Sequence, residues 1–244
     1  MAQAGLALAY PEICQLCRQE AAGPSDGWVG ENCRAQVRFI RPPYCESCGH
    51  PVEGEVESAF QCPNCRDHRW AFEQARGAAR AQGVVLEAVH RLKYLQETWF
   101  AGFLAGLIRD SLSPRERWER PWDAVVPVPL HPRKQKERGF NQSVLIGGIL
   151  SRELGLPLED AWVRRVRDTP TQTRLDRKAR LGNLHHAFHA MPRPRVPGVV
   201  LLLDDVLTTG ATLSSCAQAL KQSGVRRVEA WAVARGLSSP PLSV

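Results

Sequence analysis

The sequence contains no long apolar run. None of its 244 residues belongs to an uninterrupted hydrophobic stretch near the ~18 residues that a membrane-spanning helix needs. Residues 1–10 are mildly apolar, but they lack a basic start and are too short for a secretory signal. We therefore expect a cytoplasmic protein without membrane insertion.

Composition narrows the class further. Hydrophobic residues make up 43% of the chain and charged residues 23%, which is typical of a globular protein with one good core and a small second unit. The net charge is +7 and the pI is near 9.2. This balance favours anionic ligands such as nucleic acid, phosphorylated sugars or an acidic lipid surface, although arginines spread over a solvated surface would give the same charge.

Cysteine is nearly missing from the second half of the chain and crowded into the first. Of the eight cysteines, all but Cys216 precede residue 66. The N-terminal stretch has no long amphipathic segment, so it cannot bury enough apolar area to fold unaided. Its cysteines do form three Cys-x-x-Cys pairs. A Cys-x-x-Cys turn presents two thiolates to one tetrahedral ion, and two such turns complete a four-cysteine site.

We expect bound zinc to stabilise the fold of this segment. The later pairs predict a zinc ribbon with four ligands, which are Cys45, Cys48, Cys62 and Cys65. An earlier cluster of Cys14, Cys17 and Cys33 predicts a second ribbon that lacks its last ligand, because Gln36 stands where the fourth cysteine is expected. A disulfide framework is the alternative, but the cysteines here are odd in number and no secretion signal is visible. Three such motifs in one small segment also favour metal over redox chemistry.

The pattern changes from residue 71 onward, where strands and helices alternate. Apolar spacing predicts helices over 84–94, 98–112, 140–154 and 212–223, and strands over 76–81, 124–128, 199–203 and 228–234. This alternation predicts an α/β domain with a mainly parallel sheet and helices on both faces. We expect a zinc-ribbon domain over residues 1–70 and the α/β domain over 71–244.

The most informative stretch is 199–213, which combines a strand, a turn and a helix start. An apolar run is followed by two carboxylates, Asp204 and Asp205, at the edge where parallel sheets bind ligands. These carboxylates can accept hydrogen bonds from vicinal sugar hydroxyls. The turn that follows can surround a phosphate with hydroxyls and backbone N–H groups, and it consists of Thr208, Thr209, Gly210, Ala211 and Thr212. An ordinary capped turn is the alternative, but it needs neither two carboxylates nor three threonines.

This stretch resembles the phosphoribosyl pyrophosphate (PRPP) signature of type I phosphoribosyltransferases at every fixed position. The resemblance implies that Asp204 and Asp205 contact the ribose hydroxyls and act in catalysis, and that the turn binds the 5-phosphate. It also implies Mg²⁺ bound together with PRPP.

Two further segments fit this resemblance. A cationic loop after the strand at 124–128 corresponds to the family's pyrophosphate loop, and its cations are Arg133, Lys134, Lys136 and Arg138. They could equally contact DNA phosphates or form a solvated surface. The polar stretch 169–188 corresponds to a hood that closes over PRPP, with Thr171, Gln172 and Arg180 as its site residues. His185, His186 and His189 lack a spaced partner for a metal shell.

The whole pattern from Cys14 to Arg235 is similar to the ComF family of competence-associated proteins. The matching motifs are the cysteine ribbons, Arg-Leu-Lys93-Tyr, Val-Pro-Val-Pro with Arg138-Gly-Phe-Asn-Gln, the hood stretch and the PRPP signature. The resemblance implies a role in natural competence, with contact to single-stranded DNA and to competence machinery proteins. A salvage or biosynthetic phosphoribosyltransferase and a non-catalytic PRPP-sensing or DNA-binding module are the alternatives. The residues indicate no acceptor substrate, so whether the chain is an enzyme stays open.

Overall fold

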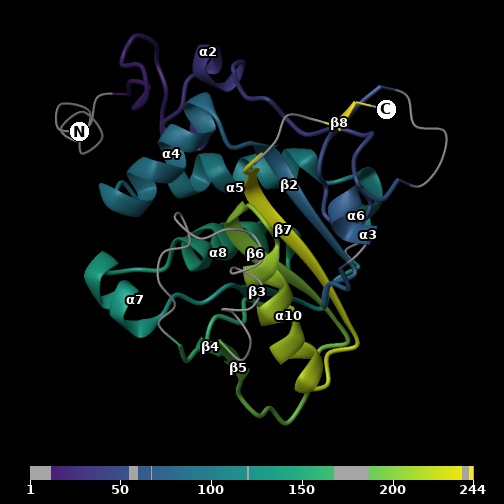
Figure 1. Cartoon of the computed structure of the whole chain (residues 1–244). Coiled ribbons are helices and arrows are strands. Elements are labelled where there is room, and N and C mark those ends of the chain that lie inside the picture. Colours follow the sequence, from purple (N-terminus) through teal and green to yellow (C-terminus); the bar gives the residue numbers. More distant parts are fainter. Residues whose placement is uncertain are drawn as a thin grey trace.

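A four-stranded parallel sheet forms the centre of the molecule (Figure 1). The computed structural model describes residues 12–54, 60–66, 68–119, 121–167, 187–237 and 242–243. In spatial order the strands are β2 (Gln74–Arg80), β7 (Arg227–Arg235), β6 (Val199–Leu207) and β3 (Ala124–Pro127). Every neighbouring pair is parallel, which confirms the predicted sheet.

The two central strands are apolar because both of their faces are covered. Leu201 and Leu203 of β6 belong to the core on one side of the sheet, whereas Val200 and Leu202 belong to the core on the other side. All four side chains are fully buried. A strand buried on both faces carries a continuous apolar run rather than an alternating one, which is the pattern that the sequence has here.

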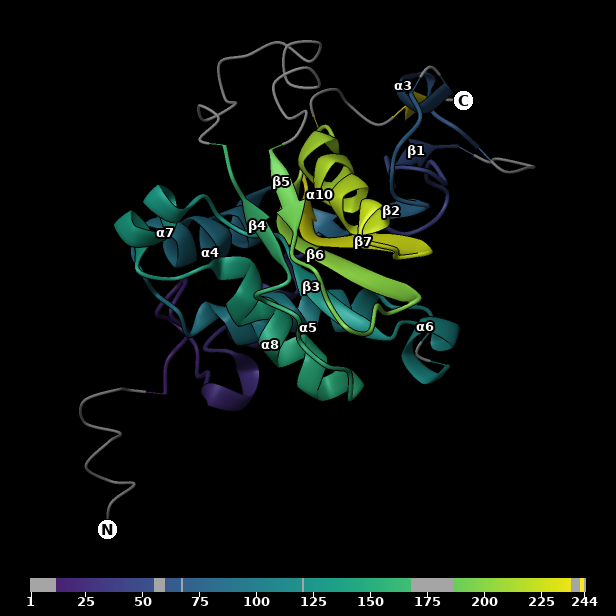
Figure 2. The ribbon, with the colours of Figure 1, turned by 90° about the horizontal axis from the view of Figure 1, so that it is seen from below.

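Helices cover both faces of the sheet (Figure 2). One face carries α4 (Gly83–Tyr94), α5 (Phe100–Ser111) and α8 (Gln142–Leu154). The other carries α10 (Ala211–Gln222), beside a two-stranded antiparallel ribbon of β4 (Val163–Arg165) and β5 (Phe188–Ala190). The four helices start and end within two residues of their predicted limits. The sequence did not predict β4 and β5, which are only three residues long.

One strand is longer than expected. We expected β6 to end at Leu203, before the two aspartates, but it continues through Asp204 and Asp205 to Leu207. Its pairing with β7 holds up to the Leu207–Arg235 register, so the backbone stays extended past the apolar run. The acidic pair therefore lies within the C-terminal part of the strand, and the threonine turn begins at Thr208.

Irregular segments cover both edges of the sheet. Residues 38–47 hydrogen-bond along β2 and residues 157–159 hydrogen-bond along β3. The backbone bonds are Arg80 N to Arg38 O (2.8 Å), Ile40 N to Ala78 O (2.9 Å), Ala75 N to Ser47 O (2.9 Å), Val125 N to Pro157 O (2.9 Å) and Glu159 N to Val125 O (2.9 Å). The N-terminal segment is thus fastened to the sheet along β2.

The remaining elements are short. They are a 3-10 helix η1 (Pro24–Asp26), α2 (Glu31–Arg34), α3 (Pro63–Arg66), α6 (Pro114–Trp118), α7 (Pro132–Arg138), and the strands β1 (Val52–Glu53) and β8 (Leu242–Ser243), which pair in parallel. The cationic stretch expected as a loop therefore contains a helix, α7, started by a proline at its first turn. Within the described part of the chain, no helix is long and apolar enough to cross a membrane.

Candidate functional site

The acidic pair and the threonine turn meet at the carboxyl end of β6, as the sequence predicted. Thr208 and Thr209 connect β6 to α10, and Gly210 precedes the first residue of that helix with φ +86°, a conformation that favours glycine. A cavity of about 230 Å³ opens beside them. Its lining residues are Lys93, Val128, Pro129, Leu130, Lys134, Gln142, Arg165, Asp204, Asp205 and Thr212.

Lys93 is the cation nearest to the acidic pair. It lies in the last turn of α4, and its ammonium group forms an ion pair with Asp205, whose side chain is almost fully buried. Burial lowers the pKa of Lys93 to about 8, against the attraction of Asp204 and with the help of repulsion from Arg138. Lys93 thus balances part of the negative charge of the two carboxylates.

Asp204 has a different environment from its neighbour. Its carboxylate accepts a hydrogen bond from the hydroxyl of Ser143, at 3.2 Å, in the first turn of α8. Burial raises the pKa of Asp204 to about 6, although the Lys93 charge and the Ser143 hydrogen bond both act to lower it. Near neutral pH the Asp204 carboxylate is therefore close to its titration range.

The cations of α7 do not act as one group. Lys134 lines the cavity with the acidic pair. Arg133 is exposed and pairs with Glu137 at 3.2 Å. The guanidinium of Arg138 lies 5.7 Å from the centre of the Tyr94 ring and donates to Gln142. Of the four cations predicted to contact pyrophosphate or DNA, the structure therefore brings only Lys134 to the wall of this cavity.

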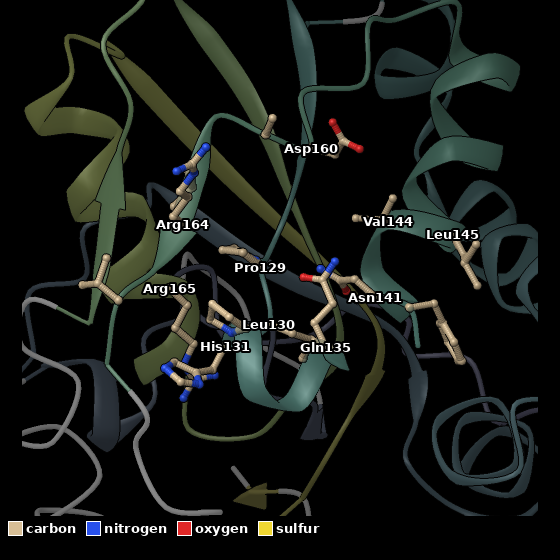
Figure 3. Close-up of a pocket in the computed structure, with 15 residues that line it drawn as sticks. Pro129, Leu130, His131, Gln135, Asn141, Val144, Leu145, Asp160, Arg164 and Arg165 are labelled. Carbon is tan, nitrogen blue, oxygen red and sulfur yellow. The ribbon is translucent and has the colours of Figure 1, made fainter. Parts of the chain in front are cut away.

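A larger cavity of about 720 Å³ adjoins the first one (Figure 3). The two share Pro129, Leu130 and Arg165. Asn141 on the side of α8 and Arg165 on the side of β4 lie on opposite walls. The Asn141 side chain is already engaged, because it donates to the Val128 carbonyl at 3.0 Å and accepts from the backbone N–H of residue 143. Most of the remaining wall is apolar.

Sequence reasoning missed three polar residues of the site. It named Lys93 only as part of a family motif, and it did not single out Ser143 or Arg165. All three come from elements distant in sequence from the acidic pair, so no local spacing signals them. The hood residues Thr171, Gln172 and Arg180 lie outside the described residues, as do His185 and His186, whereas His189 lies in β5 opposite Arg164.

The later cysteine pairs form one compact cluster. The sulfur atoms of Cys45, Cys48, Cys62 and Cys65 all lie within 4.8 Å of one another, and all four residues are buried. The sulfurs of Cys48 and Cys62 are 3.8 Å apart. A zinc–sulfur bond of ~2.3 Å places tetrahedral sulfurs about 3.8 Å apart, so the four residues fit zinc. All eight cysteines are free.

The first cluster is not short of a donor, and on this point the sequence-based expectation was wrong. A carboxylate oxygen of Glu20 lies with the sulfurs of Cys14, Cys17 and Cys33, all within 4.8 Å. Residue 36, where the missing ligand was expected, is exposed. The backbone N–H of Asn32, with that of Cys33, holds the pKa of Glu20 below its ordinary value. An ionised carboxylate is a zinc ligand, so three sulfurs and one oxygen complete this site.

Room for Glu20 comes from a glycine. A Cβ on Gly30 would lie 2.2 Å from the carboxyl carbon of Glu20. The same carboxylate accepts backbone hydrogen bonds at the start of α2, at 2.8 Å from Asn32 and 3.1 Å from Cys33. Sequence spacing could not reveal this donor, because Glu20 reaches the cluster from a turn that no Cys-x-x-Cys pattern includes.

Comparison with known proteins agrees with this architecture. Residues 5–66 match the double zinc ribbon domain family, and residues 141–243 match the phosphoribosyl transferase domain family. The fold and the two cysteine clusters therefore define a phosphoribosyltransferase-domain protein with an N-terminal double zinc ribbon that holds structural zinc.

Individual relatives narrow the assignment. Competence protein F of Haemophilus influenzae is 31% identical over 227 residues, covering 91% of this chain and 96% of that protein. DNA utilization protein YhgH of Escherichia coli K12 is 30% identical over 233 residues, covering 94% and 100%. Competence protein ComFC of Bacillus subtilis is 25% identical over 210 residues, covering 82% and 80%. The chain belongs to the competence protein F (ComF) family.

The two clusters predict two zinc equivalents rather than the single one that an incomplete first ribbon would give. Elemental analysis of protein purified without chelator should find two, Cys62→Ser should lower the content to one, and Glu20→Gln should speed zinc loss from the first cluster at least ~10-fold. Cys216→Ser removes a buried cysteine outside both clusters and should keep two. A single equivalent in the unaltered chain would contradict the role of Glu20.

The raised pKa of Asp204 predicts a pH-dependent effect on stability. Because its folded-state pKa is about 6 against an ordinary 3.8, ionised Asp204 destabilises the fold above that window and its protonated form does not. Asp204→Asn should therefore raise the free energy of unfolding at pH 8, with a gain that shrinks as the pH falls toward 4. Urea titrations across this range measure it, with exposed Asp160→Asn as a control. A gain that is constant or grows on acidification would contradict the burial of this charge.

Proposed function

We propose that the chain binds PRPP together with Mg²⁺ in the cavity at the carboxyl end of β6. The observation that carries the proposal is the convergence of three kinds of group on one cavity. Asp204 and Asp205 supply anionic acceptors, Thr212 belongs to a small-residue turn at a helix start, and Lys93 with Lys134 supplies cations. These are the groups that a ribose diol, a phosphate and a pyrophosphate require.

Each part of the ligand has a matching part of the site. The ribose hydroxyls donate to the carboxylates, and the 5-phosphate lies in the turn between Thr208 and Thr212, near the start of the α10 helix. Lys134 faces the pyrophosphate. Mg²⁺ bound together with PRPP would neutralise part of the negative charge of the pyrophosphate.

Lys93 changes partner on binding. The Lys93 ammonium group forms an ion pair with Asp205. When a ribose hydroxyl takes that carboxylate, the ammonium group of Lys93 becomes available to the pyrophosphate within the same cavity. The site therefore exchanges an internal ion pair for contacts to the ligand.

Removal of both acceptors should abolish this binding. Asp204→Asn with Asp205→Asn keeps side-chain size but removes two charge-assisted hydrogen bonds, which corresponds to a loss of at least ~100-fold in affinity for PRPP with Mg²⁺. Titration calorimetry measures the change. Asp123→Asn, at the opposite end of β6, where its carboxylate accepts from the backbone of Val199, should bind as the unaltered chain does. Equal affinity in the double variant would sink the site assignment.

A second candidate function is transfer of the phosphoribosyl group. The adjoining cavity of about 720 Å³ supports it, because this cavity shares Pro129, Leu130 and Arg165 with the proposed PRPP cavity and would have room for an acceptor beside the ribose. An acceptor nitrogen would bond to the anomeric carbon while the bond to pyrophosphate breaks, and Asp204 or Asp205 would stabilise the positive charge that develops. Pyrophosphate release across a panel of nucleobases and amines distinguishes a transferase from a non-catalytic PRPP sensor.

The names of the relatives support a biological role in DNA use. Their names are competence proteins and a DNA utilization protein. We propose that this chain acts in natural competence in the cytoplasm, with single-stranded DNA and competence machinery proteins as partners. Charge supports a DNA contact, because Arg133 and Lys136 are exposed on α7 and half-buried Arg138 lies against the exposed Tyr94 ring.

Two variants in α7 should separate DNA binding from PRPP binding. Lys136→Ala should weaken the binding of single-stranded DNA alone, whereas Lys134→Ala, on the cavity wall, should weaken the binding of both ligands several-fold. Each phosphate contact contributes about −0.7 to the slope of log affinity against log salt, so the DNA affinity should fall steeply with salt. PRPP and Mg²⁺ at saturating concentrations should also lower the affinity for single-stranded DNA. Fluorescence anisotropy with a labelled oligonucleotide measures all of this, and a DNA affinity unaffected by salt and by PRPP would refute the shared surface.

A further inference from the structure

A buried arginine joins the second cysteine cluster to the threonine turn. Arg235 is the last residue of β7, and its side chain is almost fully buried. Its guanidinium donates to the sulfur of Cys48 at 3.4 Å and to the backbone carbonyl of Thr208 at 2.8 Å. A longer contact, 3.4 Å, reaches the carbonyl of Leu207. One side chain thus binds a zinc ligand with one nitrogen and the backbone of the turn with another.

A tryptophan makes a second link. The indole N–H of Trp70 donates to the sulfur of Cys65 at 3.2 Å. Its ring stacks on Phe72 with the centroids 5.4 Å apart, and a Cβ on Gly210 would lie 3.5 Å from Phe72 and 3.6 Å from Trp70. The two rings therefore form a wall against the turn. The backbone of Ala71, between them, donates to the hydroxyl of Ser214 in the first turn of α10, at 3.1 Å.

The ribbon that holds these sulfurs is itself docked rigidly on the sheet. Its Cys45–Cys48 turn ends in Gly49, with φ +64°, whose Cβ would lie 2.8 Å from the carbonyl oxygen of Ala75 in β2. Gly77 leaves space for the arginine, because a Cβ there would lie 2.8 Å from the Cβ of Arg235. Only glycine fits at these close approaches. The ribbon is therefore packed closely on β2, and β2 is packed closely on Arg235, which contacts both the cluster and the turn.

Electrostatics explains why the arginine needs the metal centre. A buried guanidinium requires an anion, and among the described residues Arg235 forms no ion pair with a carboxylate. Four thiolates on one zinc ion carry a net negative charge, which supplies the counter-charge through Cys48. We therefore expect a metal-loaded cluster to hold the orientation of Arg235, and with it the hydrogen bond to the Thr208 carbonyl.

We propose that the Cys45–Cys65 cluster holds the Thr208–Gly210 turn in its ligand-binding conformation, with Arg235 and Trp70 as positioning residues. Zinc in the ribbon and a phosphate-bearing ligand in the turn then strengthen each other's binding, since coupling between two sites is reciprocal. This inference rests on the proposed function for the identity of the ligand, PRPP, but not for the link between cluster and turn.

Amide hydrogen exchange tests the link without any ligand. In the zinc-loaded full chain, Arg235→Lys keeps the charge but loses the forked contacts, and Trp70→Phe keeps the ring but loses the N–H to sulfur bond. Both should speed exchange in residues 207–213 about tenfold. Matched controls are Arg91→Lys, which alters an arginine paired with Glu97, and Trp122→Phe, which loses a bond to Glu229. These should leave the exchange of this segment unchanged.

Zinc release to a chelating indicator provides the second readout. Saturating PRPP with Mg²⁺ should slow release from the Cys45–Cys65 cluster about tenfold in the unaltered chain, and less than twofold in either variant. Exchange in residues 207–213 that is equal in the variants and the controls would overturn the proposal. If the exchange responds as expected but calorimetry finds no PRPP binding to the zinc-loaded chain, the link stands and the proposed function alone fails. Trp70→Phe keeps the test decisive if Arg235→Lys does not fold.

Discussion

The parallel pairing of β6 with β7 is the constraint on which the site depends. It continues four residues past the apolar run that ends at Leu203, to the Leu207–Arg235 register, and so it fixes the backbone on both sides of the acidic pair. It also carries Arg235 to a position under the turn. Because neither strand has solvent on its faces, this geometry is set by the core packing of the whole domain and not by the loops around the ligand cavity.

The features predicted from the sequence are those encoded by neighbours along the chain. The strand, the acidic pair and the turn at 199–213 form one continuous segment, and the spacing of the Cys-x-x-Cys pairs identifies the cysteines as metal ligands. Lys93 and Ser143 were not predicted as site residues, because each reaches Asp204 or Asp205 only through helix packing on the sheet. Glu20 was missed for another reason, because it lies near Cys17 in the sequence but is not part of a Cys-x-x-Cys pair. The domain boundary between residues 70 and 71 stays a prediction, and Trp70 contacts both sides of it.

The two carboxylates, Asp204 and Asp205, are identical residues in different environments. Asp205 is buried against a lysine, whereas Asp204 accepts a hydroxyl and faces the cavity with a pKa near 6. Two adjacent residues of a strand point in different directions, so they sample different surroundings. A chain with both carboxylates equally paired would be better neutralised, but neither would be ready for a ligand.

The covered edges of the sheet limit how copies of this protein can associate. Unpaired strand edges are templates for other strands, and both edges here, β2 and β3, are occupied by irregular segments of the same chain. The segment on β2 belongs to the ribbons, whose folding needs metal. We therefore expect zinc loss to expose the β2 edge, so that it can pair with a strand of another copy.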